Sequence, residues 1–236
     1  MRRIGILGGM SWQSSIEYER IINDEVSRRL GGVASADLII RSFNFAQIEA
    51  LQSAGDWAGA GRVLARAACD LERAGADLLV LATNTMHRLA ADIEAATTIP
   101  LLHIADPTAR AAREAGVTVV GLLGTRYTME ADFYAGRLRT RHGLEVLVPD
   151  PASRELVHAV IYDELVRGIV RPASRDAYRR VSEQLVADGA EGIIAGCTEI
   201  ELLIGPEDIA VPYFPTARLH ALAAADAALA PEVEEP

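Results

Sequence analysis

The chain has 236 residues, half of them hydrophobic, and a formal net charge of −10 at pH 7. A chain of this size and apolarity can bury a sizeable core, as one large domain or two small ones. Its acidic charge disfavours nucleic acids and anionic membranes as partners, because neither would meet a basic surface. We therefore expect the partner to be a small molecule.

Short runs of branched apolar residues alternate along the chain with longer helical patterns. This alternation predicts βαβ units, in which helices cover both faces of a parallel sheet. The expected strands are, in chain order, residues 4–7, 37–40, 78–81, 117–123, 144–148 and 192–195.

Helix ends are also indicated by local sequence. Ser14 and Glu17 have the spacing of a capping box at a helix start. Asp150 before Pro151 is typical of an N-cap followed by the first helical residue, and Gly116 is typical of a C-terminal stop.

Two pairs of similar segments indicate an internal duplication. "IGILGG" at residues 4–9 matches "VGLLGT" at 120–125, and "GADLLVLATNTM" at 75–86 matches "GAEGIIAGCTEI" at 189–200 at nearly the same offset. Repeated sequence predicts repeated structure. The expected fold class is α/β, with two pseudosymmetric halves that are each a small parallel sheet flanked by helices, and with the active site in the cleft between them.

We expect the halves to divide near residue 106. The first domain would comprise residues 1–106 and a returning C-terminal helix at 209–230, and the second would comprise 107–208. The tail at 231–236, rich in glutamate and proline, is expected to be disordered.

The second repeat places Thr83 and Cys197 at matching positions, each just after a predicted strand. Ligands of parallel sheets collect beyond these strand ends, where the following helices offer free N–H groups. Groups on opposite sides of a ligand suit racemisation, since a proton must leave one face of a carbon and return to the other. A helix N-terminus can lower the pKa of a thiol, so we expect Cys197 to act as a base near neutral pH.

Lysine, cysteine and histidine usage excludes several kinds of chemistry. None of the 23 basic residues is a lysine, so pyridoxal phosphate cannot be held through its usual Schiff base. The two cysteines are too few for a disulfide framework, and the histidines show no metal-ligand spacing. We expect no cofactor and no metal.

Targeting signals are also missing from the sequence. The apolar run at residues 4–10 is short and lacks a cleavage site, and no stretch approaches the ~20 apolar residues of a membrane helix. We expect a soluble, cytoplasmic protein.

Several motifs together resemble the aspartate/glutamate racemase family. They span residues 4–221 and read "IGILGGMSWQSSIEYERIIN", "ATNTMH", "LLGTRYTMEADFYAGRL", "GCTEI" and "LHA". The resemblance implies a homodimeric enzyme without cofactor or metal, which transfers a proton at the Cα of aspartate or glutamate between Cys197 and an opposed Thr83. It also implies a preference for the L enantiomer.

Two positions depart from the family pattern. Most members carry cysteine where this chain has Thr83, and the chain resembles a subset with threonine there. A hydroxyl is a far weaker acid than a thiol, so we expect Thr83 to donate or relay a proton. The second departure is Pro215, where aspartate is usual in the family.

The resemblance also implies residues that bind the substrate. Matched by motif, these are Met10, Gln52, Asn84, Thr85, Thr125, Thr198 and Glu199. Residues 42–52 contain no basic side chain for the distal carboxylate, so Arg126 and Arg167 are candidates. The choice between aspartate and glutamate stays open.

Plainer roles compete for the same residues. Cys197 could be an inert core residue, Thr83 a helix cap and His87 a hydrogen-bonded structural residue. Cys69, in a helical pattern, is expected to be a small buried helix residue.

Other function classes also compete with a racemase. A single-thiol decarboxylase or cis–trans isomerase of small dicarboxylates would use Cys197 alone, and a non-catalytic binder of acidic amino acids would leave the Cα hydrogen in place.

Overall fold

The computed structural model describes residues 1–231, which form two compact units, each with its own four-stranded sheet. The second unit comprises Thr83–Arg88 and Ile104–Leu219, and the first comprises the other described residues. Residues 83–88 and 209–219 thus pack with the second unit, whereas the sequence prediction placed both in the first domain. Apart from residue 231, the tail that was predicted to be disordered lies outside the described residues.

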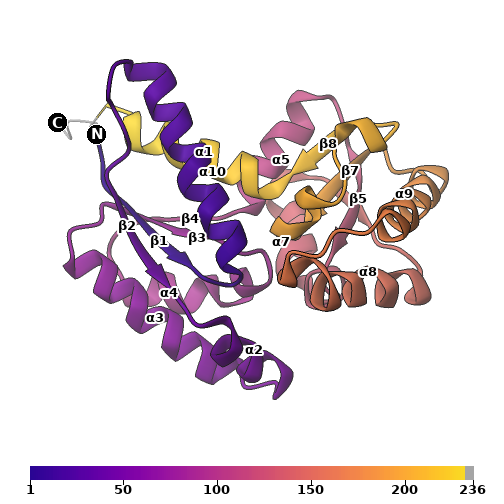
Figure 1. The fold of residues 1–236 in the computed structure, drawn as a ribbon, viewed down its shortest axis with the longest axis horizontal. Helices are drawn as coiled ribbons and strands as arrows, with labels where there is room; N and C mark the ends of the chain where they lie inside the picture. Colours follow the sequence, from indigo (N-terminus) through magenta and orange to yellow (C-terminus); the bar gives the residue numbers. More distant parts are fainter. Residues whose placement is uncertain (232–236) are drawn as a thin grey trace. The chain divides into compact units, whose positions relative to one another are not determined.

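The first unit is built on a fully parallel sheet in the order β2-β1-β3-β4. Helices α1 and α10 lie on one side of this sheet and α3 and α4 on the other (Figure 1). Its strands are β1 (Ile4–Gly8), β2 (Leu38–Ser42), β3 (Leu78–Leu81) and β4 (Leu101–Leu102). Its helices are α1 (Trp12–Leu30), α2 (Phe45–Ser53), α3 (Trp57–Arg73), α4 (Ala90–Ala96) and most of α10 (Thr216–Leu229).

The second unit repeats this topology with a parallel sheet in the order β6-β5-β7-β8. Its strands are β5 (Val119–Gly124), β6 (Glu145–Leu147), β7 (Gly192–Gly196) and β8 (Tyr213–Pro215). Its α-helices are α5 (Ala105–Glu114), α6 (Arg126–Glu130), α7 (Asp132–His142), α8 (Pro151–Asp163) and α9 (Pro172–Ala187). Short 3₁₀ helices are η1 (Thr85–Leu89), η2 (Leu165–Arg167), η3 (Thr198–Leu202) and η4 (Pro206–Asp208). The predicted α/β fold with two parallel sheets flanked by helices is confirmed.

Alternating side chains of β7 divide the core of the second unit into two layers. Ile194 packs with residues of α5 and α7, whereas Ile193 and Ala195 pack with residues of α8 and α9. Successive side chains of a strand point to opposite faces, so this period of two continues to Cys197, which lies in the same cluster as Ile193. The strand therefore directs the thiol toward the α8–α9 side of the sheet.

The predicted helix ends had different outcomes. Asp150 caps α8, its carboxylate accepting N–H groups of the first turn, and Gly116 follows α5 with a φ of +74°. Both predictions are confirmed. The capping box at Ser14 is wrong, because α1 already begins at Trp12 and the Ser14 hydroxyl lies 3.3 Å from that of Ser11.

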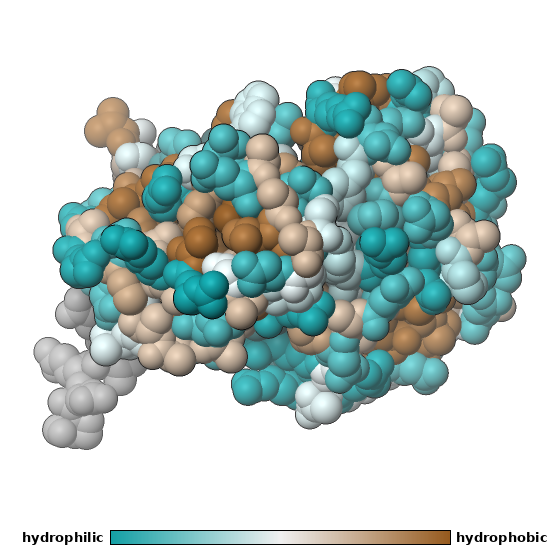
Figure 2. All heavy atoms as spheres, turned by 90° about the horizontal axis from the view of Figure 1, so that it is seen from below, coloured by the Kyte–Doolittle hydropathy of each residue, from teal (hydrophilic) through white to brown (hydrophobic). Residues whose placement is uncertain are grey.

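The surface mixes polar and apolar side chains. On the face in Figure 2, hydrophobic patches lie between hydrophilic side chains. Trp12 and Ile16, one turn apart in α1, are exposed. Over residues 1–231, none of the helices combines the length and the apolar character that crossing a membrane requires.

Candidate active site

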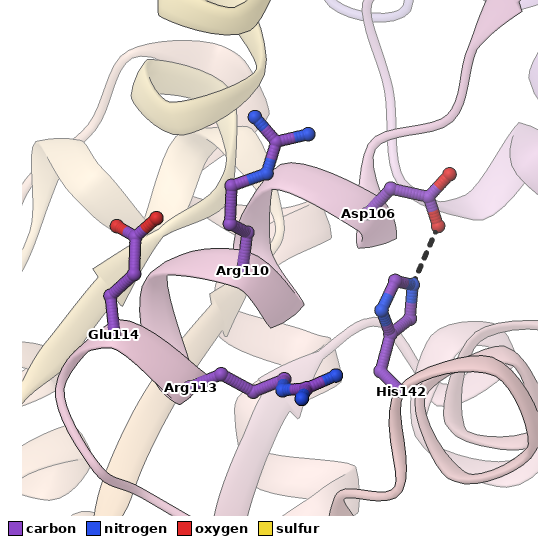
Figure 3. Close-up of a pocket in the computed structure, with 5 residues that line it drawn as sticks. All are labelled: Asp106, Arg110, Arg113, Glu114 and His142. Carbon is purple, nitrogen blue, oxygen red and sulfur yellow. Dashed lines mark hydrogen bonds and ion pairs between the residues drawn. The ribbon is translucent and has the colours of Figure 1, made fainter.

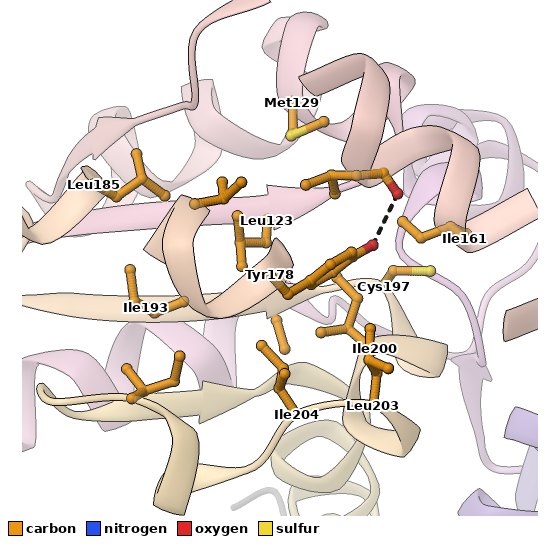
Figure 4. Close-up of a cluster of buried hydrophobic side chains, with 14 of the residues drawn as sticks. Leu123, Met129, Ile161, Tyr178, Leu185, Ile193, Cys197, Ile200, Leu203 and Ile204 are labelled. Carbon is orange, nitrogen blue, oxygen red and sulfur yellow. Dashed lines mark hydrogen bonds between the residues drawn. The ribbon is translucent and has the colours of Figure 1, made fainter. Parts of the chain in front are cut away.

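Cys197 lies at the carboxyl end of the buried central strand β7 and immediately before η3. Its side chain is at the edge of the hydrophobic cluster formed with α8 and α9 (Figure 4). The residue is only 7% exposed. The predicted strand-end position of the thiol is therefore present in the structure.

The thiol of Cys197 is hydrogen-bonded to the carboxylate of Glu199. Cys197 Sγ donates to Glu199 Oε2 at 2.9 Å, and Thr198 Oγ1 donates to the same oxygen at 2.8 Å. Burial raises the pKa of the Cys197 thiol well above its ordinary value, and the neighbouring Glu199 carboxylate raises it further. The expected lowering of the thiol pKa by a helix N-terminus is wrong, because η3 is a single short turn and these two effects outweigh it.

The backbone carbonyl of Thr83 is hydrogen-bonded to the side chain of His87. The His87 Nε2 atom accepts the Ile104 N–H at 3.1 Å, so the ring proton is on Nδ1, which lies 2.7 Å from the Thr83 carbonyl oxygen and donates to it. This neutral imidazole fixes the segment that follows β3 to the start of α5. The structural role considered for His87 is confirmed.

Asn84 presents a buried acceptor without a partner among residues 1–231. The Thr216 hydroxyl donates to the Ala195 carbonyl at 2.7 Å, and its oxygen lies 2.9 Å from Asn84 Nδ2. The hydroxyl has therefore used its proton, so the Asn84 amide nitrogen must be the donor. The Asn84 Oδ1 atom is left buried and unpaired, which is costly unless a ligand donates to it.

Thr85, the residue after Asn84, brings its hydroxyl close to the hydroxyls of two threonines from a distant segment of the chain. Thr85 Oγ1 lies 2.9 Å from Thr125 Oγ1 and 3.4 Å from Thr128 Oγ1. Thr125 also caps α6, since its side chain accepts the Thr128 N–H. Thr128 and Thr216 were not predicted, because nothing in the local sequence indicates that these hydroxyls meet others far along the chain.

Met10 and Gln52 belong to the first unit, whereas the other predicted site residues belong to the second. Met10 follows the turn that ends β1, where Gly9 has a φ of +82°. A Cβ at Gly9 would lie 2.4 Å from the Phe43 backbone, so only glycine fits this turn. Met10 and Gln52 are both buried, 5% and 4% exposed.

Glu201 is a second acidic group near the thiol in sequence, and it was not predicted. Its Oε1 atom accepts the Ala217 N–H at 2.9 Å, at the first turn of α10. Burial raises the pKa of this carboxyl to about 7. The sequence "CTEIE" does contain this second glutamate, two residues after the "CTE" motif from which the site residues were predicted.

The remaining predicted positions have clear surroundings. Pro215 ends β8, an edge strand of the second sheet, where the missing N–H of proline is tolerated. Arg126 begins α6 and lies 3.9 Å from Glu155 across an exposed ion pair, and Arg167 ends η2. Cys69 lies half-buried in α3, and its thiol donates to the Ala96 carbonyl. Within the described residues, no three His, Cys, Asp or Glu side chains are grouped to hold a metal ion.

The paired parallel sheets, followed after the third strand of each by a threonine or a cysteine, define the protein as a two-unit α/β protein. The family model for Asp/Glu/Hydantoin racemases matches residues 7–224. The chain therefore belongs to the Asp/Glu/hydantoin racemase family.

Similar proteins of known structure support this assignment. The crystal structure of a putative Asp/Glu racemase from Yersinia pestis is 53% identical, covers 98% of this chain and 100% of its own, and superposes with a TM-score of 0.91. An aspartate racemase homologue from Pyrococcus horikoshii is 35% identical over 97% of this chain and 99% of its own, with a TM-score of 0.81.

A curated relative is more distant. The broad-specificity amino-acid racemase RacX of Bacillus subtilis is 26% identical over 140 residues, which is 58% of each chain.

Proposed function

We propose that the protein is a cofactor-independent racemase of acidic amino acids that favours the L enantiomer. The observation that carries the proposal is the Cys197 thiol, hydrogen-bonded to the buried carboxylate of Glu199 at the end of β7. Family membership and the similarity to a putative Asp/Glu racemase support aspartate or glutamate as substrate.

The hydrogen bond from Cys197 to Glu199 defines the first proton transfer. The proton moves from Sγ to Glu199 Oε2, and the resulting thiolate removes the Cα hydrogen of the amino acid and becomes a thiol again. Thr83 donates its hydroxyl proton to the opposite face of the carbanion. Solvent then takes the proton from Glu199 and returns one to Thr83, so both groups regain their starting states. One C–H bond is broken and one is formed, so no oxidant or cofactor is needed.

Substrate binding is proposed for the polar groups around this pair. The unpaired Asn84 Oδ1 atom is suited to accept a hydrogen bond from the substrate ammonium. The hydroxyls of Thr85 and Thr125 are suited to donate to the α-carboxylate, whereas the Thr198 hydroxyl donates to Glu199 Oε2. Met10 and Gln52 are proposed as further substrate-binding residues, as the family motifs imply.

Recognition of the distal carboxylate is proposed for an arginine of the second unit. Arg126 directly follows the threonine that caps α6, and its exposed contact with Glu155 is long and therefore weak. Arg167 is the other candidate. A homodimer is proposed from the family resemblance, and light scattering of the purified protein tests it.

Proton NMR of aspartate and of glutamate in heavy water tests the proposed reaction. The parent protein is expected to remove the Cα proton signal of at least one of them, and Cys197→Ala is expected to leave it intact. Cys69→Ala is the matched control and should behave as the parent does. If an amino acid binds and its Cα signal persists with the parent protein, the protein is a binder and the racemase proposal is wrong.

A single-thiol enzyme is the second candidate, because Thr83 supplies no second thiol. Such an enzyme would act on maleate or on substituted malonates with Cys197 alone. Incubation with these compounds separates the two proposals, since turnover of them without exchange at the Cα of amino acids would favour the single-thiol reaction.

A further inference from the structure

A pocket of about 460 Å³ lies between α5 and α7 in the second unit. This volume is within the range of ~300–1,000 Å³ found for small-molecule sites. Its lining is charged, and Figure 3 shows it: Asp106, Arg110, Arg113, Glu114 and His142. The lining contains none of the residues assigned to the proposed racemase site.

Two arginines of the pocket are free to bind a ligand. Arg110 and Arg113 lie one turn apart on α5 and are exposed. Among residues 1–231 neither has a hydrogen-bond or ion-pair partner. Other arginines of this unit form ion pairs with carboxylates, as Arg137 does with Asp106 at 2.6 Å. Two unpaired guanidinium groups on one helix face favour an anion between them.

Asp106 orients the imidazole of His142 at the edge of the pocket. Its Oδ1 atom lies 2.9 Å from His142 Nε2, and its Oδ2 atom accepts from Arg137. Figure 3 shows the other ring nitrogen of His142 on the side that faces Arg110 and Arg113. Burial by itself would raise the pKa of the Asp106 carboxyl, but the hydrogen bonds from Arg137 and His142 lower it, so the group is charged and committed to these two partners.

We propose that this pocket binds a small molecule carrying a phosphate group. Two guanidinium forks match the several oxygens and the double charge of a phosphate better than the two oxygens of a single carboxylate. Glu114, on the same helix, can accept a hydrogen bond from a hydroxyl or amino group of the same ligand.

The pocket is connected to Thr83 through the start of α5. Asp106 lies in the first turn of that helix, and the preceding Ile104 N–H donates to His87, which holds the Thr83 carbonyl. A ligand that shifts this turn would shift Thr83 and thereby alter turnover. This consequence rests on the proposed function, whereas the binding itself does not.

A calorimetric titration of pyrophosphate into the full chain at constant ionic strength tests the site. The parent protein should bind about one equivalent, and the double variant Arg110→Gln, Arg113→Gln should bind on the order of tenfold more weakly or worse. Because both side chains are exposed and unpaired, the thermal unfolding of this variant should match that of the parent.

The double variant Arg62→Gln, Arg66→Gln is the matched control. It removes the same charge from an exposed pair one turn apart on α3, a helix that contributes no residue to the pocket lining. Its affinity for pyrophosphate should equal that of the parent. Non-saturable binding, or an equal loss in both double variants, would show diffuse charge attraction and overturn the proposal. Tighter binding of malonate than of pyrophosphate, lost in the pocket variant alone, would overturn the assignment to phosphate.

Discussion

At the scale of single residues, one carboxylate oxygen holds the reactive group of the site. Glu199 Oε2 accepts both the Cys197 thiol and the Thr198 hydroxyl. Burial and the Glu199 carboxylate both raise the pKa of this thiol, so the protonated form is favoured. In the proposed mechanism Glu199 accepts the proton of the thiol.

Replacing Glu199 by glutamine is expected to make the Cys197 thiol more acidic. The substitution removes the negative charge that raises the thiol pKa, while burial still acts. Alkylation of Cys197 by iodoacetamide should then reach half its maximal rate at a lower pH than in the parent. Mass spectrometry over a pH series measures this, with Cys69 as the internal control. An unchanged profile would mean that Glu199 carries no charge beside the thiol.

Substitutions at Thr83 are expected to separate racemisation from hydrogen exchange. The hydroxyl is needed only for inversion, so Thr83→Ala should lower racemisation about 100-fold, in the range of general acid catalysis, and lower exchange of the favoured enantiomer less. Thr83→Cys should bring the exchange rates of the two enantiomers closer together. Chiral chromatography and proton NMR on the same samples measure both rates.

Thr83→Ser is the conservative control, since it keeps the hydroxyl and the backbone bond to His87. Equal exchange of both enantiomers by the parent protein would contradict the unequal pair of Cys197 and Thr83.

At the scale of elements, the turn after β7 also supports the start of α10. Glu201 in η3 accepts the Ala217 N–H, so one short helix carries both the acceptor for the thiol and the partner for the next helix. Burial raises the pKa of Glu201 from 4.5 to about 7. The protonated carboxyl is thus favoured in the folded state.

The protein should lose stability from Glu201 as the pH rises. Because the pKa of Glu201 is raised in the folded state, its contribution to the free energy of unfolding is fully present below the pKa of the unfolded state, about 4.5. This contribution is lost as the pH rises through the folded-state pKa of about 7. Glu201→Gln removes this titration, so above pH ~7 the variant should exceed the parent in free energy of unfolding by roughly 1–3 kcal/mol.

Urea unfolding at about pH 5 and pH 8 measures this difference. The exposed Glu183 of α9 provides the control as Glu183→Gln. If Glu201→Gln and the parent show the same dependence on pH, the carboxyl does not titrate in this range.

At the scale of the whole molecule, the chain repeats one topology in two units and has no lysine. The proposed proton transfers use only side chains of the protein and solvent. Dialysis against a metal chelator is therefore expected to leave at least most of the activity, and added pyridoxal phosphate should not raise it. Activity assays before and after dialysis measure this, and a strong loss that zinc or magnesium restores would sink the cofactor-independent mechanism.

Much of the fold could be predicted from local sequence. The six predicted strands correspond to β1, β2, β3, β5, β6 and β7, because buried parallel strands are nearly continuous apolar runs. The structure adds β4 and β8, which are only two and three residues long. Such short edge strands exist through pairing with β3 and β7, so their own sequence carries almost no pattern.

By itself, the sequence determined that a thiol and a hydroxyl follow equivalent strands, because strand ends and repeats are local features of the chain. Only the tertiary structure decided the chemistry of these groups. The raised pKa of Cys197, the unpaired Oδ1 atom of Asn84 and the charged pocket beside Asp106 all depend on burial or on partners far along the chain. A pKa or an unmet hydrogen bond is set by all the atoms around a group, and folding alone brings those atoms together.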